Sequence, residues 1–449
     1  MIGKWTLERV AACTEGRLTG DNASFDRVVT DSRKDCRNAL FVALQGPRFD
    51  AHEHVNEARG KGAVGALVSR DVSEVPHVQV DDTLQALQKL GQANRGAFTG
   101  PVVALTGSMG KTTVKEMLRR ILGEQTCATE GNLNNHVGVP LSLLQLSPEH
   151  QFGVFELGAN HEGEIARSVS WVRPDVALVT VVGRAHVGEF GGADAVLRAK
   201  SEIFSGLQTG GVAVIPAGQP YTQTLKKRVP EGCRVLTFGL DGEADVRLDI
   251  TGTDADGYCR AQVLWHGESA GELSLSIPGV HSVYNAAAAL AVTAALELDV
   301  SEQVCRLNGF AGEAGRLGIR RFGTLTVIDD SYNANPDSMK AALSVLASRH
   351  ETRKLALLGS MAELGAESDA MHREVLDFAS QLSVEVVTVG HWPVSDRSGE
   401  QFETSDEAGR WLSAVLKQES EPVVVLIKGS RSVQMEKVVN MLQKTGSPD

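Results

Sequence analysis

The stretch that decides the fold reads Val102-Val103-Ala104-Leu105-Thr106-Gly107-Ser108-Met109-Gly110-Lys111-Thr112-Thr113. It begins with an apolar run typical of a short buried strand, turns through glycines, and continues into a segment with helical spacing of apolar residues. The residues at i, i+3, i+4, i+7 and i+8 of that segment are Val114, Met117, Leu118, Ile121 and Leu122. A strand, a glycine-rich turn and a helix in this order indicate a parallel β-α-β unit.

The turn itself has the composition of a phosphate-binding loop. Its glycines let backbone N–H groups point toward phosphate oxygens, and the helix that follows adds partial positive charge. We expect Lys111 to reach the β- and γ-phosphates and the hydroxyl of Thr112 to bind Mg²⁺. The predicted nucleotide-binding residues of the loop are Gly107, Ser108, Met109, Gly110, Lys111, Thr112 and Thr113. The alternative is a glycine-rich β-α turn with a surface lysine, and Leu105 stands where the common pattern has glycine.

Two further predicted strands bring metal-binding residue types to the same edge of the sheet. Glu156 ends a strand at 152–157, and His186 follows a strand at 176–182. The carboxyl ends of parallel strands face the crevice where ligands bind, so both side chains are candidate Mg²⁺ ligands. The alternatives are a solvated carboxylate at a strand end and an ordinary loop histidine. Lys200 lies in a helical pattern, and its spacing alone indicates a solvated residue.

The 449 residues divide into three blocks, which we predict as domains at 1–83, 84–313 and 314–449. The first block has short strand patterns separated by polar loops and is predicted to be a small α/β module. The second contains the phosphate-binding loop in a parallel sheet. The third alternates strands and helices as in a doubly wound, Rossmann-like domain. Its predicted strands are 325–329, 354–358, 384–389 and 423–428, and its helices lie near 337–348, 371–381, 405–416 and 432–442.

Charge and hydropathy exclude several classes of protein. The net charge of −12 disfavours a nucleic-acid-binding or anionic-membrane surface. The longest nearly apolar run, Ala286 to Leu296, is much shorter than the roughly 20 residues of a membrane helix, so no membrane insertion is expected. The N-terminus lacks the pattern of a signal peptide, which predicts a cytoplasmic protein. The 6 cysteines form no Cys-x-x-Cys pair and are expected to be reduced.

Six motifs, in this order, resemble those of the Mur ligases of peptidoglycan synthesis. They are the phosphate-binding loop, Gly131-Asn132-Leu133-Asn134-Asn135-His136-Val137-Gly138-Val139-Pro140, Glu156-Leu157-Gly158-Ala159-Asn160, Ala185-His186, Ala199-Lys200-Ser201-Glu202, and Asp329-Asp330-Ser331-Tyr332-Asn333-Ala334-Asn335-Pro336-Asp337-Ser338. The match covers essentially the whole chain, and the family's own loop is a variant in which Leu105 is expected. The second and last motifs resemble the members that add D-alanyl-D-alanine to a UDP-N-acetylmuramoyl-tripeptide.

The resemblance implies a monomeric, ATP-dependent ligase with UDP-binding, ATPase and C-terminal domains. It implies that the tripeptide carboxylate attacks ATP to form an acyl phosphate, which the amine of D-alanyl-D-alanine then attacks. It also implies that Lys200 is carbamylated by CO₂ and joins Glu156 and His186 around Mg²⁺, with two ions in the site. Lys111 and Arg316 would neutralise phosphate charge.

Further residue roles are also implied only by the resemblance. His281 and Asn285 match a helix start near the adenine, Arg316 a phosphate contact, and Asp330 a ribose contact. The alternative for the first two is a helix cap on an alanine-rich packed face. Because Arg316 and Asp330 belong to the last block, we expect hinge motion near 312–316, detectable as compaction in solution scattering.

The resemblance also assigns residues to the substrates. They are Ser32, Arg33, Asp50, His52, Asn134, Asn135, Asn333, Ala334, Asn335, Lys428, Ser430 and Arg431. The residues in the first block could equally be ordinary turn formers, and those at 428–431 a basic helix start. Ser360 stands where the family usually has aspartate, which weakens any role for that position.

Three alternative functions remain at this point. A ligase for the third amino acid typically carries Asp-Asn-Pro-Arg in its last domain, and that tetrapeptide is absent here. A folylpolyglutamate synthase lacks a UDP-sugar domain such as the first block. A P-loop switch would hydrolyse ATP without an amino acceptor, and bicarbonate dependence of the activity would argue against it.

Overall fold

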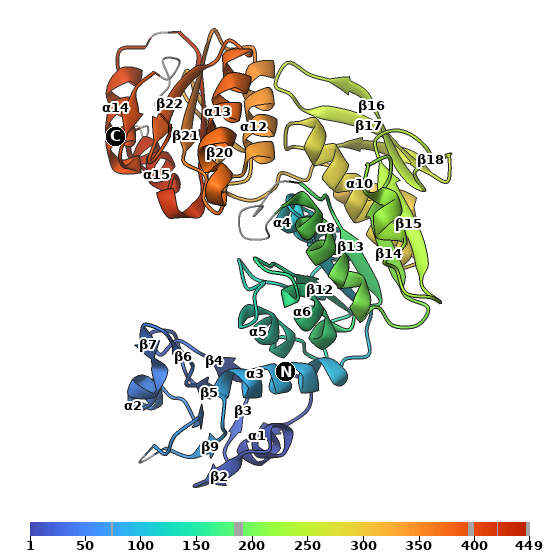
Figure 1. Cartoon of the computed structure of the whole chain (residues 1–449), viewed down its shortest axis with the longest axis vertical. Coiled ribbons are helices and arrows are strands. Elements are labelled where there is room, and N and C mark those ends of the chain that lie inside the picture. Colours follow the sequence, from blue (N-terminus) through green and yellow to red (C-terminus); the bar gives the residue numbers. More distant parts are fainter. Residues whose placement is uncertain (73–74, 184–191, 394–398, 420, 446–449) are drawn as a thin grey trace.

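The computed structural model describes residues 1–72, 75–183, 192–393, 399–419 and 421–445. Three α/β lobes follow one another along the chain, each built on its own main sheet (Figure 1). The N-terminal and C-terminal lobes lie on the same side of the central lobe in this view. The predicted fold class is therefore confirmed, while the boundaries at 83/84 and 313/314 stay predictions.

The N-terminal lobe contains a five-stranded sheet. Its order is β2 (Arg17–Thr19), β9 (His77–Gln79), β8 (Gly65–Val68), β5 (Ala39–Val42) and β4 (Arg27–Val29). All neighbours are parallel except β2 and β9. Helices α1 (Leu7–Thr14), α2 (Val55–Gly60) and α3 (Thr83–Gly96) accompany it, and α3 also packs on α5 of the next lobe.

The central lobe is built on a nine-stranded sheet. Its order is β11 (Thr126–Ala128), β12 (Phe152–Glu156), β10 (Val102–Thr106), β13 (Val176–Val179), β14 (Val212–Pro216), β15 (Arg234–Gly239), β16 (Val246–Thr253), β17 (Cys259–Trp265) and β18 (Glu268–Ser274). The strands are parallel as far as β16 and then continue into the antiparallel strands β17 and β18. This antiparallel extension was not predicted from the sequence.

Helices cover both faces of this sheet. They are α4 (Lys111–Leu122), α5 (Gly138–Leu144), α6 (Glu164–Val172), α8 (Ala193–Ser201), α9 (Thr222–Lys226), α10 (Val280–Ala295) and α11 (Val300–Leu307). Val103 and Leu105 of β10 belong to a core with α4 and α10, whereas Val102 and Ala104 belong to a core with α5 and α6. A strand buried on both faces explains the continuous apolar run in the sequence. All five predicted apolar positions of α4 are buried.

Alanines dominate the buried face of α10. Their short side chains let this helix lie close against the sheet and against α4, which it contacts along with β14, β15 and β16. Its apolar stretch, Ala286 to Leu296, is shorter than the roughly 20 residues of a membrane helix. Within the described residues, no helix is long and apolar enough to cross a membrane.

The C-terminal lobe has a six-stranded sheet. Its order is β19 (Gly318–Phe322), β20 (Leu325–Asp330), β24 (Val423–Lys428), β21 (Arg353–Gly359), β22 (Glu385–Val389) and β23 (Gln401–Phe402). The helices are α12 (Pro336–Ser348), α13 (Ser368–Ser380), α14 (Ser405–Leu416) and α15 (Glu436–Thr445). Among the described strands of this sheet, only β19 runs antiparallel to its neighbour. Gly312 and Gly315, in the segment that leads into this lobe, both have φ of 75°, a conformation that favours glycine.

Candidate active site

A cavity of about 1240 Å³ lies between the carboxyl edge of the central sheet and the C-terminal lobe. Both lobes contribute side chains to its wall. The predicted residues that line it are Ser108, Met109, Gly110, Lys111, Thr112, Thr113, Asn134, Asn135, Glu156, Lys200, His281, Asn285, Arg316, Asp330, Asn333, Ala334, Asn335, Lys428 and Arg431. Residues far apart in the sequence therefore meet around one space large enough for a nucleotide and a second ligand.

The loop between β10 and α4 is held closed by neighbouring elements. Gly107 and Gly110 have φ of 152° and 79°, a region that L side chains rarely adopt. A Cβ on Gly107 would lie 2.0 Å from Thr180 Oγ1, and one on Gly110 would lie 2.3 Å from Asn285 Oδ1. The Thr180 hydroxyl also donates to the carbonyl of Met109 at 2.6 Å. Both positions therefore require glycine for conformation and for space.

Lys111 begins α4, directly after the glycine turn. Its ammonium donates to the carbonyl of Gly107 at 2.7 Å, so the side chain folds back over the loop. Burial lowers the pKa of Lys111, and the charge of Arg316 acts in the same direction, whereas Glu156 opposes the shift. A cation held over the loop is the group that stabilises phosphate charge in P-loop proteins.

A chain of hydrogen bonds joins the C-terminal lobe to the sheet edge. Nη2 of Arg316 donates to Thr112 Oγ1 at 2.8 Å, and that hydroxyl donates to Glu156 Oε2 at 2.9 Å. Asn134 Nδ2 donates to the other oxygen, Glu156 Oε1, at 2.8 Å. The guanidinium of Arg316 also lies over the ring of Tyr332, 4.2 Å from its centroid. These bonds fix a buried carboxylate and a hydroxyl side by side at the start of α4.

Lys200 is buried, contrary to the solvated position that its spacing alone indicated. Its residue is 1% exposed, yet it reaches the wall of the cavity from α8. Burial lowers the pKa of Lys200 to about 7, with a further contribution from the positive charge of Lys111. Near neutral pH this amine is therefore partly uncharged and nucleophilic.

The C-terminal lobe presents a second set of polar groups at the ends of β20 and β24. Lys428 Nζ donates to Asp330 Oδ2 at 2.6 Å and to the carbonyl of Asn333 at 2.9 Å. Asn335 caps α12 by accepting the N–H of Ser338 at 2.8 Å. Lys428 is thus an anchor for the 330–335 loop rather than a solvated helix start.

We expect Lys428→Met to destabilise the C-terminal lobe by about 3 kcal/mol, because it leaves the carboxylate of Asp330 without its buried cation. Urea unfolding measures the change. The double variant Lys428→Met with Asp330→Asn should recover part of the loss, since it removes the unpaired charge. Equal stability of wild type and Lys428→Met would contradict this role.

The predicted UDP-sugar contacts of the N-terminal lobe do not line the cavity. They are Ser32, Arg33, Asp50 and His52. Asp50 Oδ1 lies 2.6 Å from His52 Nδ1, and His52 Nε2 accepts the backbone N–H of Ser69 at 2.9 Å. The contacts with Asp50 and Ser69 fix the orientation of the His52 ring. Because the backbone N–H of Ser69 occupies the acceptor nitrogen of that ring, His52 does not serve as a base for the Ser69 hydroxyl. Ser32 donates to Glu57 at 2.9 Å, and the exposed Arg33 pairs with Asp31 at 2.9 Å. Their predicted contact with the UDP-sugar stays a prediction.

The remaining predicted residues are His186, Gly107 and Ser430. His186 lies outside the described residues, so its role stays a prediction. Gly107 and Ser430 do not line the cavity, and the buried hydroxyl of Ser430 donates to the carbonyl of Ser360 at 2.7 Å. Sequence reasoning missed Tyr332, although it lies inside a quoted motif, because nothing local indicates that Arg316 covers its ring.

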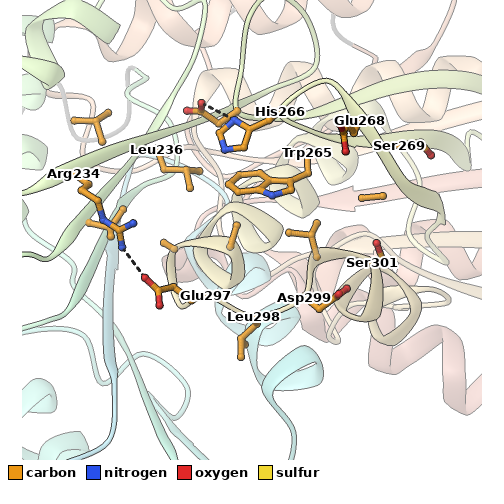
Figure 2. A pocket seen from close by; sticks show the side chains of 17 residues that line it. Arg234, Leu236, Trp265, His266, Glu268, Ser269, Glu297, Leu298, Asp299 and Ser301 are labelled. Atoms are coloured by element: carbon orange, nitrogen blue, oxygen red, sulfur yellow. Dashed lines mark hydrogen bonds and ion pairs between the residues drawn. The ribbon is translucent and has the colours of Figure 1, made fainter.

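A second pocket, of about 570 Å³, lies at the other end of α10 and contains none of the predicted residues (Figure 2). The rings of Trp265 and His266 are tilted by 41° to each other, with centroids 3.9 Å apart. Asp245 pairs with His266, and Arg234 pairs with Glu297. It has no phosphate-binding loop. The chemistry predicted from the sequence therefore belongs to the larger cavity.

The fold and the larger cavity define a P-loop nucleotide-binding protein whose site is shared with its C-terminal lobe. Two family models match the chain: the Mur ligase middle domain at residues 105–293 and the Mur ligase glutamate ligase domain at residues 315–431. The chain belongs to the Mur ligase family, which confirms the resemblance found in the sequence.

Individual relatives are similar over nearly the whole length. The UDP-N-acetylmuramoyl-tripeptide--D-alanyl-D-alanine ligase of Escherichia coli is 38% identical, with 98% of this chain and 99% of that protein covered. The crystal structure of MurF from Acinetobacter baumannii superposes with a TM-score of 0.89 at 34% identity, covering 98% and 99% of the two chains. MurF ligase from Thermotoga maritima in complex with ADP has a TM-score of 0.81 at 30% identity, covering 93% and 97%.

Proposed function

We propose that this chain joins D-alanyl-D-alanine to a UDP-N-acetylmuramoyl-tripeptide, using ATP. It is an amide-bond-forming ligase by family, and the relatives named for this reaction match it from end to end. The observation that carries the proposal is the hydrogen-bonded row of Arg316, Thr112 and Glu156, which links the phosphate-binding loop to the lobe that would receive the acceptor. The products are the UDP-linked pentapeptide, ADP and phosphate.

The reaction has two steps. A carboxylate oxygen of the tripeptide attacks the γ-phosphorus of ATP, the bond from that phosphorus to the bridging oxygen breaks, and ADP leaves with an acyl phosphate remaining. The amine of D-alanyl-D-alanine then attacks the acyl carbon, forms a tetrahedral intermediate, loses a proton and expels phosphate. Since the transferring group carries the developing charge, catalysis depends on positioning and charge neutralisation.

Lys111 and Arg316 are proposed to neutralise this charge. Lys111 folds over the loop, and Arg316 donates to the hydroxyl of Thr112 from the other lobe. The oxygens of Thr112 and Glu156 are hard donors that suit Mg²⁺, which typically binds one or two carboxylates together with substrate phosphates. Such ions, of which we propose two, would supply positive charge beside the phosphates. His186 remains a proposed third ligand.

Lys200 is proposed to carry a carbamate. Its buried, partly neutral amine can attack the carbon of CO₂, forming an N–C bond and losing one proton, and the product bears a carboxylate-like negative charge. The exchange replaces a cation that repels Lys111 with an anion that attracts it. The modified side chain would extend the set of hard oxygen donors at the cavity wall.

The two outer lobes are proposed to hold the two substrates. Ser32, Arg33, Asp50 and His52 would contact the UDP-sugar, with the peptide extending toward the cavity. The N-terminal and C-terminal lobes lie on the same side of the central lobe, which is consistent with a long substrate spanning both (Figure 1). We propose the cytoplasm as the location, because ATP and nucleotide-linked precursors are made there.

The proposed nucleotide and dipeptide positions are supported by the residues that line the cavity. His281 and Asn285 of α10 would lie near the adenine, and burial lowers the pKa of His281, so its ring is neutral at pH 7. Asp330 would contact the ribose. Asn333, Ala334 and Asn335, together with Asn134, Asn135, Lys428 and Arg431, are the proposed contacts of the peptide substrates.

The test is phosphate release from purified protein, Mg²⁺, ATP and the UDP-linked tripeptide, with and without D-alanyl-D-alanine. Release that requires both substrates, with one pentapeptide formed per phosphate, supports the proposal. If phosphate release does not depend on the dipeptide, the assignment of D-alanyl-D-alanine as the acceptor is wrong. Single amino acids should then be compared as acceptors.

Glu156→Gln is expected to raise the Mg²⁺ concentration for half-maximal activity by at least about tenfold, because the amide keeps the size but removes the charge. Mg²⁺ titration of phosphate release measures it. Glu162→Gln is the matched control, since that carboxylate pairs with Arg198 on the surface. An unchanged Mg²⁺ requirement in Glu156→Gln would remove this carboxylate from the metal site.

A further inference from the structure

The turn between β16 and β17 projects from the central lobe to the C-terminal lobe. Its shape is set by its own hydrogen bonds: Asp254 Oδ1 accepts the N–H of Asp256 and of Tyr258, each at 2.9 Å. Gly257 donates to the carbonyl of Asp254 at 3.0 Å. We call residues 254–258 the hairpin tip. These three hydrogen bonds join residues of the tip to one another.

Asp256 of the hairpin tip meets two arginine side chains and one histidine side chain of the C-terminal lobe. Its Oδ2 lies 2.9 Å from Arg321 Nη2. Its Oδ1 lies 2.8 Å from Arg349 Nη1 and 3.1 Å from His350 Nδ1. Arg349 Nη1 also donates to the backbone carbonyl of Asp256 at 3.1 Å. One carboxylate therefore ties the tip to β19 and to the end of α12.

Arg349 is the buried centre of this contact. Its side chain is 0% exposed, and it forms a two-pronged pair with Glu351 through Nε at 3.1 Å and Nη2 at 2.7 Å. Burial alone would raise the pKa of Glu351, but the hydrogen bonds and charge of Arg349 lower it to about 2. Among the described residues, the carboxylate paired with Nη1 is that of Asp256, at 2.8 Å. Loss of that carboxylate would leave one side of a buried guanidinium without its counter-charge.

The hairpin tip also stands behind the nucleotide cavity. The carbonyl of Gly257 accepts the N–H of Gly279, the residue before α10, at 2.9 Å. That helix carries His281 and Asn285 into the cavity. On its other side, a Cβ at Gly257 would lie 3.0 Å from Ser348 Oγ of α12. The tip therefore lies against the start of α10 and the end of α12, two helices that both line the cavity.

We propose that Asp256 is a positioning residue for the ligase reaction: it holds the C-terminal lobe where Asp330 and Lys428 face the phosphate-binding loop. The inference rests on the proposed function for its kinetic part only. If the lobe undocks, substrates bind to a cavity whose wall is incomplete, and their apparent affinity falls in proportion to the docked fraction. Saturating substrates, which bridge both lobes, restore the docked form.

The test compares Asp256→Asn with Asp249→Asn, a matched control on the same hairpin. Asp249 pairs with Arg247 of its own strand at 2.8 Å. Without substrates, Asp256→Asn should have a larger radius of gyration by X-ray scattering than wild type and Asp249→Asn. Its KM for ATP should rise about tenfold while kcat falls less than about threefold, as expected for a docked fraction near one tenth. Asp256→Glu should restore part of the wild-type radius of gyration and part of the wild-type KM for ATP.

Arg321→Gln tests the same contact from the other lobe and leaves the hairpin intact if Asp256→Asn proves unstable. Arg321→Gln should also raise the radius of gyration and the KM for ATP. The increases should be smaller, because the side chain of Arg321 is 62% exposed. An unchanged radius and KM in both variants would overturn the proposal. So would a fall in kcat with KM and radius unchanged. If the wild type forms no pentapeptide, the proposed function fails, whereas the scattering comparison still decides whether Asp256 docks the lobe.

Discussion

Lys111→Ala is expected to lower the rate of pentapeptide formation by at least about 10³-fold, the largest loss we foresee for any single substitution. The ammonium of Lys111 lies over the loop and donates to the carbonyl of Gly107, so it is already in place when nucleotide binds. A preorganised cation stabilises the transferring phosphoryl group most strongly because its surroundings are shielded from water. Single-turnover phosphate release with saturating substrates measures this loss.

The matched control is Arg119→Ala, which removes a cation from the exposed face of the same helix. Arg119 pairs with Glu116 and does not line the cavity. Its activity should stay within about twofold of wild type. Nucleotide binding by calorimetry separates a binding loss from a chemical one. A Lys111→Ala variant that keeps even a tenth of wild-type turnover would mean that the loop does not hold the reacting phosphates.

Lys200→Ala is expected to lower turnover by at least about 10²-fold, because it removes the amine that would carry the carbamate. A short-chain carboxylic acid should rescue part of the activity by placing a carboxylate in the space left by the side chain. Arg198→Ala on the same helix is the control, since its guanidinium pairs with Glu162 on the surface. Full activity in Lys200→Ala, or rescue by a neutral alcohol of the same size, would remove the carbamate from the mechanism.

The pH dependence of this modification has a definite sign. The pKa of Lys200 is lowered to about 7, so the reactive neutral amine predominates above that pH and falls roughly tenfold for each unit below it. At limiting bicarbonate, wild-type activity should therefore decline steeply below pH 7, and added bicarbonate should offset part of the decline. Activity independent of bicarbonate would contradict this expectation.

The sequence predicted the elements that local pattern determines. The apolar run of β10, the helical face of α4 and the alternating strands and helices of the C-terminal lobe all appear within a few residues of their predicted bounds. Val246, Leu248 and Ile250 alternate as in a strand and could also have predicted β16. That this strand leads to a hairpin reaching another lobe has no local signal, because Asp256 and Arg349 lie far apart in the chain.

Burial was harder to predict than secondary structure. The spacing around Lys200 is that of a surface helix, yet the residue is buried within the central lobe. Only the family resemblance indicated that its amine matters. Conversely, Ser430 was expected to face the substrate and instead bonds the carbonyl of Ser360. In both cases tertiary packing decides which way a polar side chain points, and one-dimensional patterns do not encode it.

The crowding around the loop glycines limits how this site could escape an inhibitor. A compound that binds the backbone N–H groups of residues 107–111 makes contacts that a side-chain substitution does not remove. At Gly107 and Gly110 even a methyl group would collide with Thr180 or Asn285. Resistance by substitution at these two glycines would require a compensating change at a second position. Single substitutions that confer resistance are therefore expected at positions other than these two glycines.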